Sequence, residues 1–266
     1  MDNSGRATRV AIAASVAVFG ALLVLAWFYE GAVQHINLLI SAVGFVILPL
    51  LIWQFGSVRA DQVHATAARK MTLNLVMLDV EYLSKTLVEL ARQTERILGD
   101  FDRFDAARKS GRADAEETGE FRLILASTRT LPKFRYEFAF TKKDLQIFST
   151  DDFKMFDLIF GLVNTVNELN ENIAALNGNF KSALEETDKN HADGDDLYER
   201  YSFINNSYRG AFSDLLSVPR ETLPKIDGEL LPAALAYAGK NFGGADASYY
   251  ATVAARTREA IGGWET

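Results

Sequence analysis

The sequence contains no cysteine, and its three histidines are far apart. The absence of cysteine excludes disulfides, thiolate metal sites and cysteine nucleophiles, and it is compatible with a reducing compartment. The sequence also has no glycine-rich phosphate loop, no G-x-S-x-G nucleophile turn and no H-E-x-x-H zinc motif. We therefore expect neither enzymatic activity nor a cofactor.

Basic residues are also fewer than acidic residues. The chain of 266 residues has 28 Lys and Arg against 35 Asp and Glu, which gives a formal net charge of -7 at pH 7. A nucleic-acid partner would require a basic face. We therefore expect no nucleic-acid partner.

Charged residues are missing altogether from two apolar runs, residues 10–28 and 36–55. Each run is about as long as the roughly 20-residue helix that crosses a hydrocarbon core. The runs predict a transmembrane helical hairpin with a short external loop at residues 29–35. The first run is longer than the apolar region of a usual secretory signal peptide and lacks a small-residue cleavage site at its end, so we favour a retained helix.

Basic residues flank only the outer ends of the hairpin. Two arginines within residues 1–9 precede the first run, Arg59, Arg69 and Lys70 follow the second, and the connecting loop has none. Lys and Arg are enriched in the cytoplasmic segments of membrane proteins. We predict a two-pass protein of the cell membrane with both termini cytoplasmic and a cytoplasmic domain at residues 56–266.

The hairpin itself carries small residues and one proline. Ala13, Ala17, Gly20 and Ala21 lie at a spacing that lets helices approach closely in lipid, either within the hairpin or between subunits. Pro49 usually kinks a helix, which can serve a gate or simply be tolerated. Neither run contains an ionisable residue of the kind that carries protons or ions, which argues against a transporter.

Beyond the hairpin, apolar residues recur at alternating intervals of three and four, as is typical of coiled coils and helical bundles. We call each such set a seam. The three seams predict long helices at about residues 58–104, 150–184 and 195–217, the first continuing from the membrane with a break near Gly56. The seam residues are Leu73, Val76, Val80, Leu83, Leu87, Leu90, Thr94, Ile97, Phe101 and Phe104; Ile159, Leu162, Val166, Leu169, Ile173, Leu176 and Phe180; and Leu197, Tyr201, Ile204, Tyr208, Ala211 and Leu215.

The three seams can bury one another, and this predicts an all-α fold in which the hairpin continues into a cytoplasmic antiparallel bundle. Shorter helices within residues 121–131 and 230–261 would complete the bundle. In the alternative, the first seam pairs with its copy in a second subunit. Off the seam, Leu75, Met77 and Leu78 are also apolar, so we expect this part of the helix to be buried on more than one side.

Residues 133–141 have a different period. Aromatic residues at even positions, from Phe134 to Phe140, alternate with Lys133, Arg135, Glu137 and Ala139. A period of two indicates an extended chain with one aromatic face. Because no partner strand is evident, we interpret it as a connector laid across a helical core; the alternative is an aromatic ladder that binds a ligand or partner.

Polar residues surround the second seam. Thr141 to Asp144 resembles a cap that opens a short helical turn, and Ser149 is predicted to cap the long helix that follows. Prolines are expected to end the third helix at Val218–Pro219. The asparagines opposite the second seam are predicted to be solvated, with binding of a polar ligand as the alternative; they are Asn164, Asn167, Asn170 and Asn172.

Two features suggest metal or proton chemistry only weakly. Residues 188–199 match an EF-hand calcium loop at its first, third and twelfth positions, but Ala192 replaces a ligand and the turn glycine is displaced to Gly194. We expect no metal there. His64 is isolated and is interpreted as a surface residue rather than a pH sensor.

The sequence thus predicts a membrane-anchored helical interaction or sensor module without catalytic activity. Its expected partners are the lipid bilayer and either a second copy of the chain or another protein. The alternative is an oligomeric membrane effector or small channel, in which the cytoplasmic domain controls how several hairpins pack.

Overall fold

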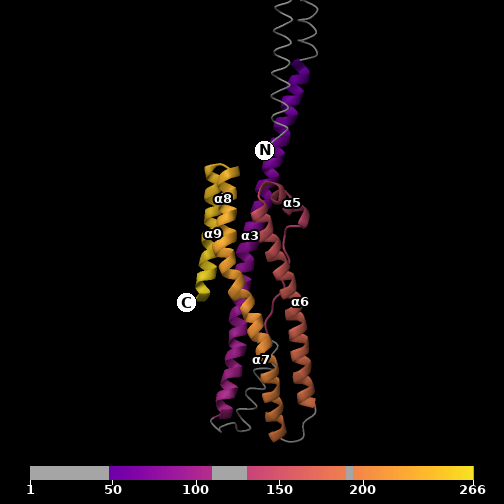
Figure 1. Cartoon of the computed structure of the whole chain (residues 1–266), viewed down its shortest axis with the longest axis vertical. Coiled ribbons are helices and arrows are strands. Elements are labelled where there is room, and N and C mark those ends of the chain that lie inside the picture. Colours follow the sequence, from indigo (N-terminus) through magenta and orange to yellow (C-terminus); the bar gives the residue numbers. More distant parts are fainter. Residues whose placement is uncertain (1–47, 110–130, 190–193, 266) are drawn as a thin grey trace, which may run out of the picture. The chain divides into compact units, whose positions relative to one another are not determined.

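The computed structural model describes residues 48–109, 131–189 and 194–265 (Figure 1). All regular elements in these three ranges are helices, so the all-α prediction is confirmed for them. The elements are α3 (Leu48–Lys109), α5 (Lys142–Asp151), α6 (Phe153–Lys189), α7 (Gly194–Lys225), the π-helix η2 (Ile226–Leu230), α8 (Leu231–Asn241) and α9 (Gly244–Glu265).

The chain divides into two compact units, Met1–Ala65 and Thr66–Thr266. Of the first unit, only residues 48–65 are described, and they form the beginning of α3. α3 passes through Pro49 and Gly56 as one helix, so the predicted break near Gly56 is wrong. Among the helices that the structure describes, none combines the length and the apolar character needed to cross a membrane.

Most of the predicted hairpin lies outside the described residues. This applies to the first run, to the external loop and to the second run before Leu48. The small residues of the first run are therefore also outside the described residues; they are Ala13, Ala17, Gly20 and Ala21. The hairpin therefore stays a prediction.

In the second unit, α3, α6 and α7 bury their seams against one another. Every residue of the first seam is at most 5% exposed. Its one polar member, Thr94, is satisfied by its own helix, because its hydroxyl donates to the Leu90 carbonyl at 2.8 Å. The intramolecular bundle is therefore the arrangement found, and the first seam is not left open for a second subunit.

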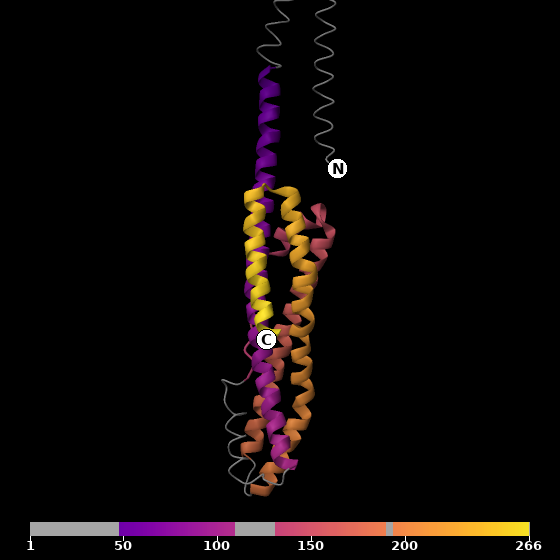
Figure 2. The ribbon, with the colours of Figure 1, turned by 90° about the vertical axis from the view of Figure 1, so that its left-hand side faces the viewer.

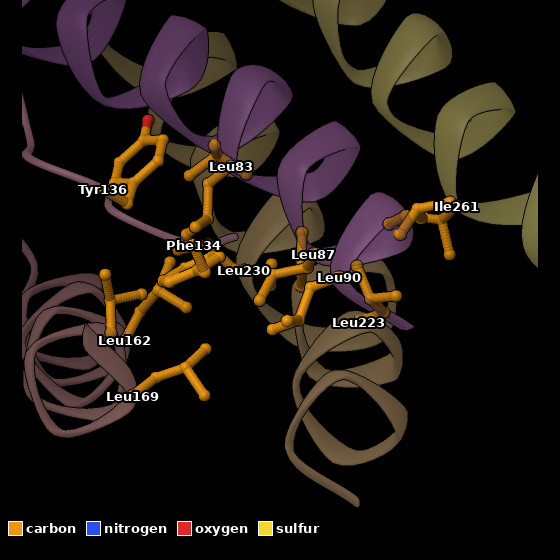
Figure 3. Packing of buried hydrophobic residues seen from close by; sticks show 14 of the residues in the cluster. Leu83, Leu87, Leu90, Phe134, Tyr136, Leu162, Leu169, Leu223, Leu230 and Ile261 are labelled. Atoms are coloured by element: carbon orange, nitrogen blue, oxygen red, sulfur yellow. The ribbon is translucent and has the colours of Figure 1, made fainter. Parts of the chain in front are cut away.

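The other two seams are also in the core. Leu176, Tyr208 and Ala211 are half-buried, and the side chain of Leu197 lies outside the described residues. Figure 3 shows side chains from several helices pointing into one space, among them Leu83, Leu87 and Leu90 from α3 and Leu162 and Leu169 from α6. The buried members of the second and third seams are Ile159, Leu162, Val166, Leu169, Ile173, Phe180, Tyr201, Ile204 and Leu215.

Three aromatic rings lock the long helices together towards the end of α3. Phe101 of α3 lies 6.3 Å from Phe180 of α6 and 5.8 Å from Phe212 of α7, measured between ring centroids. Phe180 and Phe212 are 5.3 Å apart and perpendicular. Edge-to-face pairs of this kind contribute roughly 0.5–1.5 kcal/mol each beyond the area they bury.

The predicted antiparallel order of the long helices is wrong for α3 and α6. Arg69 of α3 pairs with Asp151, which lies two residues before α6 begins, and Phe101 meets Phe180 near the ends of α3 and α6. The two helices therefore run in the same direction, whereas α7 runs against α3, because Asp105 pairs with Arg209 and Glu95 with Arg220. Figures 1 and 2 show these three helices side by side.

The parallel order arises because residues 131–141 run back along α3 before α5 begins. The Lys133 amide donates to Gln93, and the Ala139 amide donates to Asp79. From Lys133 to Ala139 an extended chain covers about 20 Å, and the helix from Gln93 back to Asp79 covers about 21 Å. The length of the connector thus matches the stretch of α3 along which it runs, and its backbone is extended, as its period of two predicted.

Two predicted helix boundaries need correction. Ser149 lies inside α5, and Asp152 caps α6 instead, with its Oδ1 accepting from the Met155 amide at 3.1 Å. Pro219 does not end α7, which continues to Lys225. A proline inside a helix costs about 3 kcal/mol. Burying each large apolar side chain returns about 1.5–3 kcal/mol, and the core residues around Pro219 outweigh that cost; they are Leu215, Leu216, Leu223 and Ile226.

Candidate functional site

Metal and ligand sites are not evident in the parts of the chain that the structure describes. Within those parts, no three His, Cys, Asp or Glu residues cluster closely enough to hold a metal ion. Most side chains of residues 188–199 lie outside the described residues, so the absence of calcium there stays a prediction. An open pocket of about 270 Å³ lies between α6, the end of α7 and η2, with Asp157 and Lys225 among its lining residues. It falls below the usual size of ligand sites, roughly 300–1,000 Å³, and we assign it no ligand.

The feature that stands out is an uncovered apolar face of α3. Met71 and Tyr82 are each 66% exposed and Leu78 is 45% exposed, whereas Leu75 is half-buried. Their spacing of four, three and four residues places all four on one face of the helix. We call Met71, Leu75, Leu78 and Tyr82 the α3 stripe.

The prediction that this part of α3 is buried on more than one side is confirmed for off-seam Met77, and the α3 stripe corrects it for Leu78. Met77 is buried, as expected, but Leu78 is not. Successive residues of a helix point 100° apart, so Met77 can face the core while Leu78 faces outward. The seam face of α3 is covered by the bundle, and no described element covers the stripe.

The α3 stripe ends at charged residues. One turn after Tyr82, Lys85 lies on the same face, and its ammonium group pairs with Glu81 at 2.8 Å. Glu81 also receives a hydrogen bond from Arg256 of α9 at 2.8 Å. Although burial alone would raise it, these two cations lower the pKa of the Glu81 carboxyl. The charges at this end are thus held within the chain.

The extended connector lies along one side of the stripe. The ring of Tyr82 lies 5.9 Å from that of Tyr136, and the ring of Phe138 follows at 5.1 Å. Phe134, Tyr136 and Phe140 are buried, so most of the aromatic face packs on the helices and is not open to a ligand. The connector interpretation is therefore confirmed, and the predicted ladder reaches the surface only through half-buried Phe138 and its neighbour Tyr82.

Two polar side chains hold the connector in place. The Asn170 carboxamide accepts from the Tyr136 amide at 2.9 Å and donates to the Tyr136 carbonyl at 2.8 Å. Asn177 donates to the Pro132 carbonyl at 2.7 Å. Asn170 therefore makes the backbone hydrogen bonds that a neighbouring strand would otherwise make to an extended chain. The sequence predicted only solvation, or binding of a polar ligand, for this residue.

Asp79 holds the connector from the side of α3. Its carboxylate accepts from the Ala139 amide at 2.8 Å, and the Tyr136 hydroxyl donates to the Asp79 backbone carbonyl at 2.7 Å and, at 3.3 Å, to the carboxylate. Burial raises the pKa of the Asp79 carboxyl above its usual value, against the lowering effect of these hydrogen bonds. Burial and the nearby carboxylate also raise the pKa of the Tyr136 phenol. The ionised form of Asp79 is therefore disfavoured by burial and stabilised by the hydrogen bonds that it accepts.

The helix α9 lies along α3 on another side of the stripe (Figure 2). Lys70 pairs with Asp246 at 2.6 Å, and the Arg92 guanidinium donates to the Gly263 carbonyl at 2.8 Å. The Tyr250 hydroxyl donates to the Lys70 carbonyl at 3.2 Å, and burial raises the pKa of this phenol to about 12. The stripe is therefore flanked by the connector on one side and by α9 on the other, and both are bonded to α3.

An ion pair fixes the start of this surface. Arg69 makes a bidentate contact with Asp151 at 2.5 and 3.1 Å, and the Tyr237 hydroxyl donates to the same carboxylate at 3.1 Å. Burial alone would raise the pKa of the Asp151 carboxyl, but these hydrogen bonds and the Arg69 charge hold it below its usual range. The pair joins α3, α5 and α8 a few residues before Met71.

The seam residues predicted as important are thus core residues, and the stripe was missed as a site. Its signal was present in the sequence, because Leu75, Leu78 and Tyr82 lie off the seam. Comparison with known proteins adds no identification: no family model matches the chain, and no curated protein or solved structure is detectably similar to it.

Proposed function

We propose that this chain is a membrane-anchored helical interaction module without catalytic activity, and that it binds protein through the α3 stripe. The observation that carries the proposal is the exposure of Met71, Leu78 and Tyr82 on a helix whose seam is fully buried. Covering a large apolar side chain stabilises a complex by about 1.5–3 kcal/mol at most. Contiguous exposed apolar residues of this kind commonly mark protein interaction sites.

The membrane anchor rests on the sequence. The runs at residues 10–28 and 36–55 have the length and the lack of charge of membrane helices, and basic residues flank only their outer ends. α3 begins at Leu48, inside the second run. On this proposal, the helix that carries the stripe is continuous with the helix that leaves the bilayer.

Single cysteines test the anchor and its orientation, because the chain has none of its own. We expect Gln34→Cys, in the predicted loop, to react with an impermeant maleimide from outside intact cells. Phe203→Cys, on an exposed position of α7, should react only after permeabilisation. Both chains should stay in membranes washed with alkaline carbonate. Labelling of Phe203→Cys in intact cells would contradict the topology, and release by the wash would contradict the anchor.

The spacing of Ala13, Ala17, Gly20 and Ala21 favours a second candidate, a membrane effector or small channel. The two functions differ in what overexpression does to cells. An effector or channel should depolarise the membrane, and this effect should fall when Gly20 is replaced by Leu. An interaction module should leave the membrane potential unchanged.

A further inference from the structure

The α3 stripe has the geometry of one half of a helix pair. Intervals of four, three and four residues are those of successive core positions in a two-stranded coiled coil. From Met71 to Tyr82 the stripe is about 16 Å long. Its members are long or aromatic side chains, and Met71 and Tyr82 are the most exposed of them, at 66% each.

The chain that precedes α3 indicates which helix that is. The 47 residues before Leu48 contain the first apolar run and most of the second, and they join α3 at its beginning. On the proposed function, every copy therefore leaves the bilayer through the same helix and in the same direction. In every copy the stripe follows the second apolar run at the same separation in sequence, so both stripes lie on the same side of the membrane.

We propose that the α3 stripe packs against the α3 stripe of a second copy, with the two helices parallel. In this isologous pair, Met71, Leu75, Leu78 and Tyr82 each meet their own counterpart. The inference rests on the proposed function, because the shared bilayer makes the helices parallel. The contact is smaller than a standard interface, but confinement in a membrane raises the effective concentration of the partner.

The charges near the stripe define where this contact ends. The next positions of the same pattern after Tyr82 are Lys85 and Glu89. In a parallel pair, each of these would face its own counterpart and therefore a like charge. Lys85 is instead held by Glu81 of its own chain. In the other direction the pattern runs through exposed Ala68 and His64 to Asp61, where each helix would again face a like charge, so the contact is confined to the stripe and the turn before it.

Disulfide cross-linking of the full chain in native membranes tests the pair and its direction. Met71→Cys and Tyr82→Cys are made separately, and the membranes are oxidised with copper phenanthroline. A disulfide requires Cα atoms within about 7 Å of each other. We expect each variant alone to give a disulfide-linked dimer. The control Phe203→Cys, 72% exposed on α7, should remain monomeric.

A second substitution tests the apolar contact. In the Met71→Cys chain, Leu78→Asp should reduce the cross-linked fraction to the level of the Phe203→Cys control. Because Leu78 is 45% exposed, this variant should keep its helical circular dichroism signal. Phe203→Asp in the same chain is the matched control, since it adds the same charge to another exposed apolar position, and it should leave the cross-linked fraction unchanged.

The possible outcomes separate this inference from the proposed function. If neither single-cysteine chain forms a dimer while both remain in washed membranes, self-association through the stripe is wrong and the anchor stands. Dimers that form only between Met71→Cys and Tyr82→Cys chains would show an antiparallel pair and overturn the proposal. Loss of both chains from washed membranes would overturn the proposed function itself.

Discussion

Replacing Asn170 should show whether its carboxamide stabilises the extended connector by hydrogen bonding to its backbone. Asn170 makes two hydrogen bonds with the backbone of Tyr136, at 2.9 and 2.8 Å. Asn170→Ala removes both and leaves a partly buried amide and carbonyl without that partner. Each lost bond costs about 0.5–1.5 kcal/mol, and an unpaired buried group costs about 1–3 kcal/mol. Since water can reach a partly buried site, we expect a loss of roughly 2–4 kcal/mol in unfolding free energy.

Asn170→Asp provides the sharper comparison, because it keeps the shape of the side chain. The ionised carboxylate can accept from the Tyr136 amide, but it repels the Tyr136 carbonyl, whereas the protonated form can donate to that carbonyl. The folded state therefore raises the pKa of the new carboxyl. A raised folded pKa means that stability falls as pH rises from the unfolded value, about 3.9, through the folded value. The variant should be weakened at pH 7 and restored near pH 4.

The assay uses the full chain in a neutral detergent. Thermal unfolding is followed by circular dichroism, and hydrogen exchange is followed at the amides of residues 134–140. Since Asp79 titrates in both proteins, the quantity compared is the difference in stability between the variant and the unmodified chain. Asn172→Asp, at an exposed position of the same helix, controls for added charge. Equal stability of Asn170→Asp and the unmodified chain at pH 7 would refute the clamp.

Three further substitutions test the core, the Arg69–Asp151 ion pair and the half-buried carboxylate of Asp79. Leu87→Asp places a charge at a position only 1% exposed, so the second unit should lose its helical signal at every protein concentration; a folded monomer would contradict the intramolecular bundle. Arg69→Met should weaken the fold at neutral pH, and the deficit should disappear as pH falls through the lowered folded pKa of Asp151, as urea midpoints would show. At pH 7, Asp79→Asn should be at least as stable as the unmodified chain, because the raised folded pKa of Asp79 means that its ionised form destabilises the fold. Near pH 4 the unmodified chain regains this stability, so the stability of the variant relative to it should fall. A large loss of stability in the variant at pH 7 would contradict this.

The features that the sequence predicted correctly are those that repeat within one helix or strand. The first seam predicted a continuous buried face of the helix from Leu73 to Phe104, and all residues of this seam are buried. The period of two at residues 133–141 predicted an extended segment, and its side chains alternate between buried and exposed. Such patterns are set by the local geometry of 3.6 or 2 residues per repeat.

The features that the sequence did not predict depend on contacts between distant residues. Nothing in the run of asparagines distinguishes Asn170, which binds a backbone 34 positions away, from exposed Asn167. The proline at 219 predicted a helix end, but the packing of its neighbours decided otherwise. The direction of α6 relative to α3 depends on the path of the connector, and the periodicity of the sequence does not predict that path.

The contrast between Met77 and Leu78 shows what only the assembled bundle can tell. Both residues are apolar and adjacent, and the sequence predicted that both would be covered. α3 receives the bundle on its seam face, the connector on one side and α9 on another, and these neighbours leave the sector of Leu78 open. A helix that needed only to hold this fold could carry a polar residue at position 78 without loss. The apolar choice there is therefore best explained by a contact outside the bundle, which the paired cysteine variants are designed to detect.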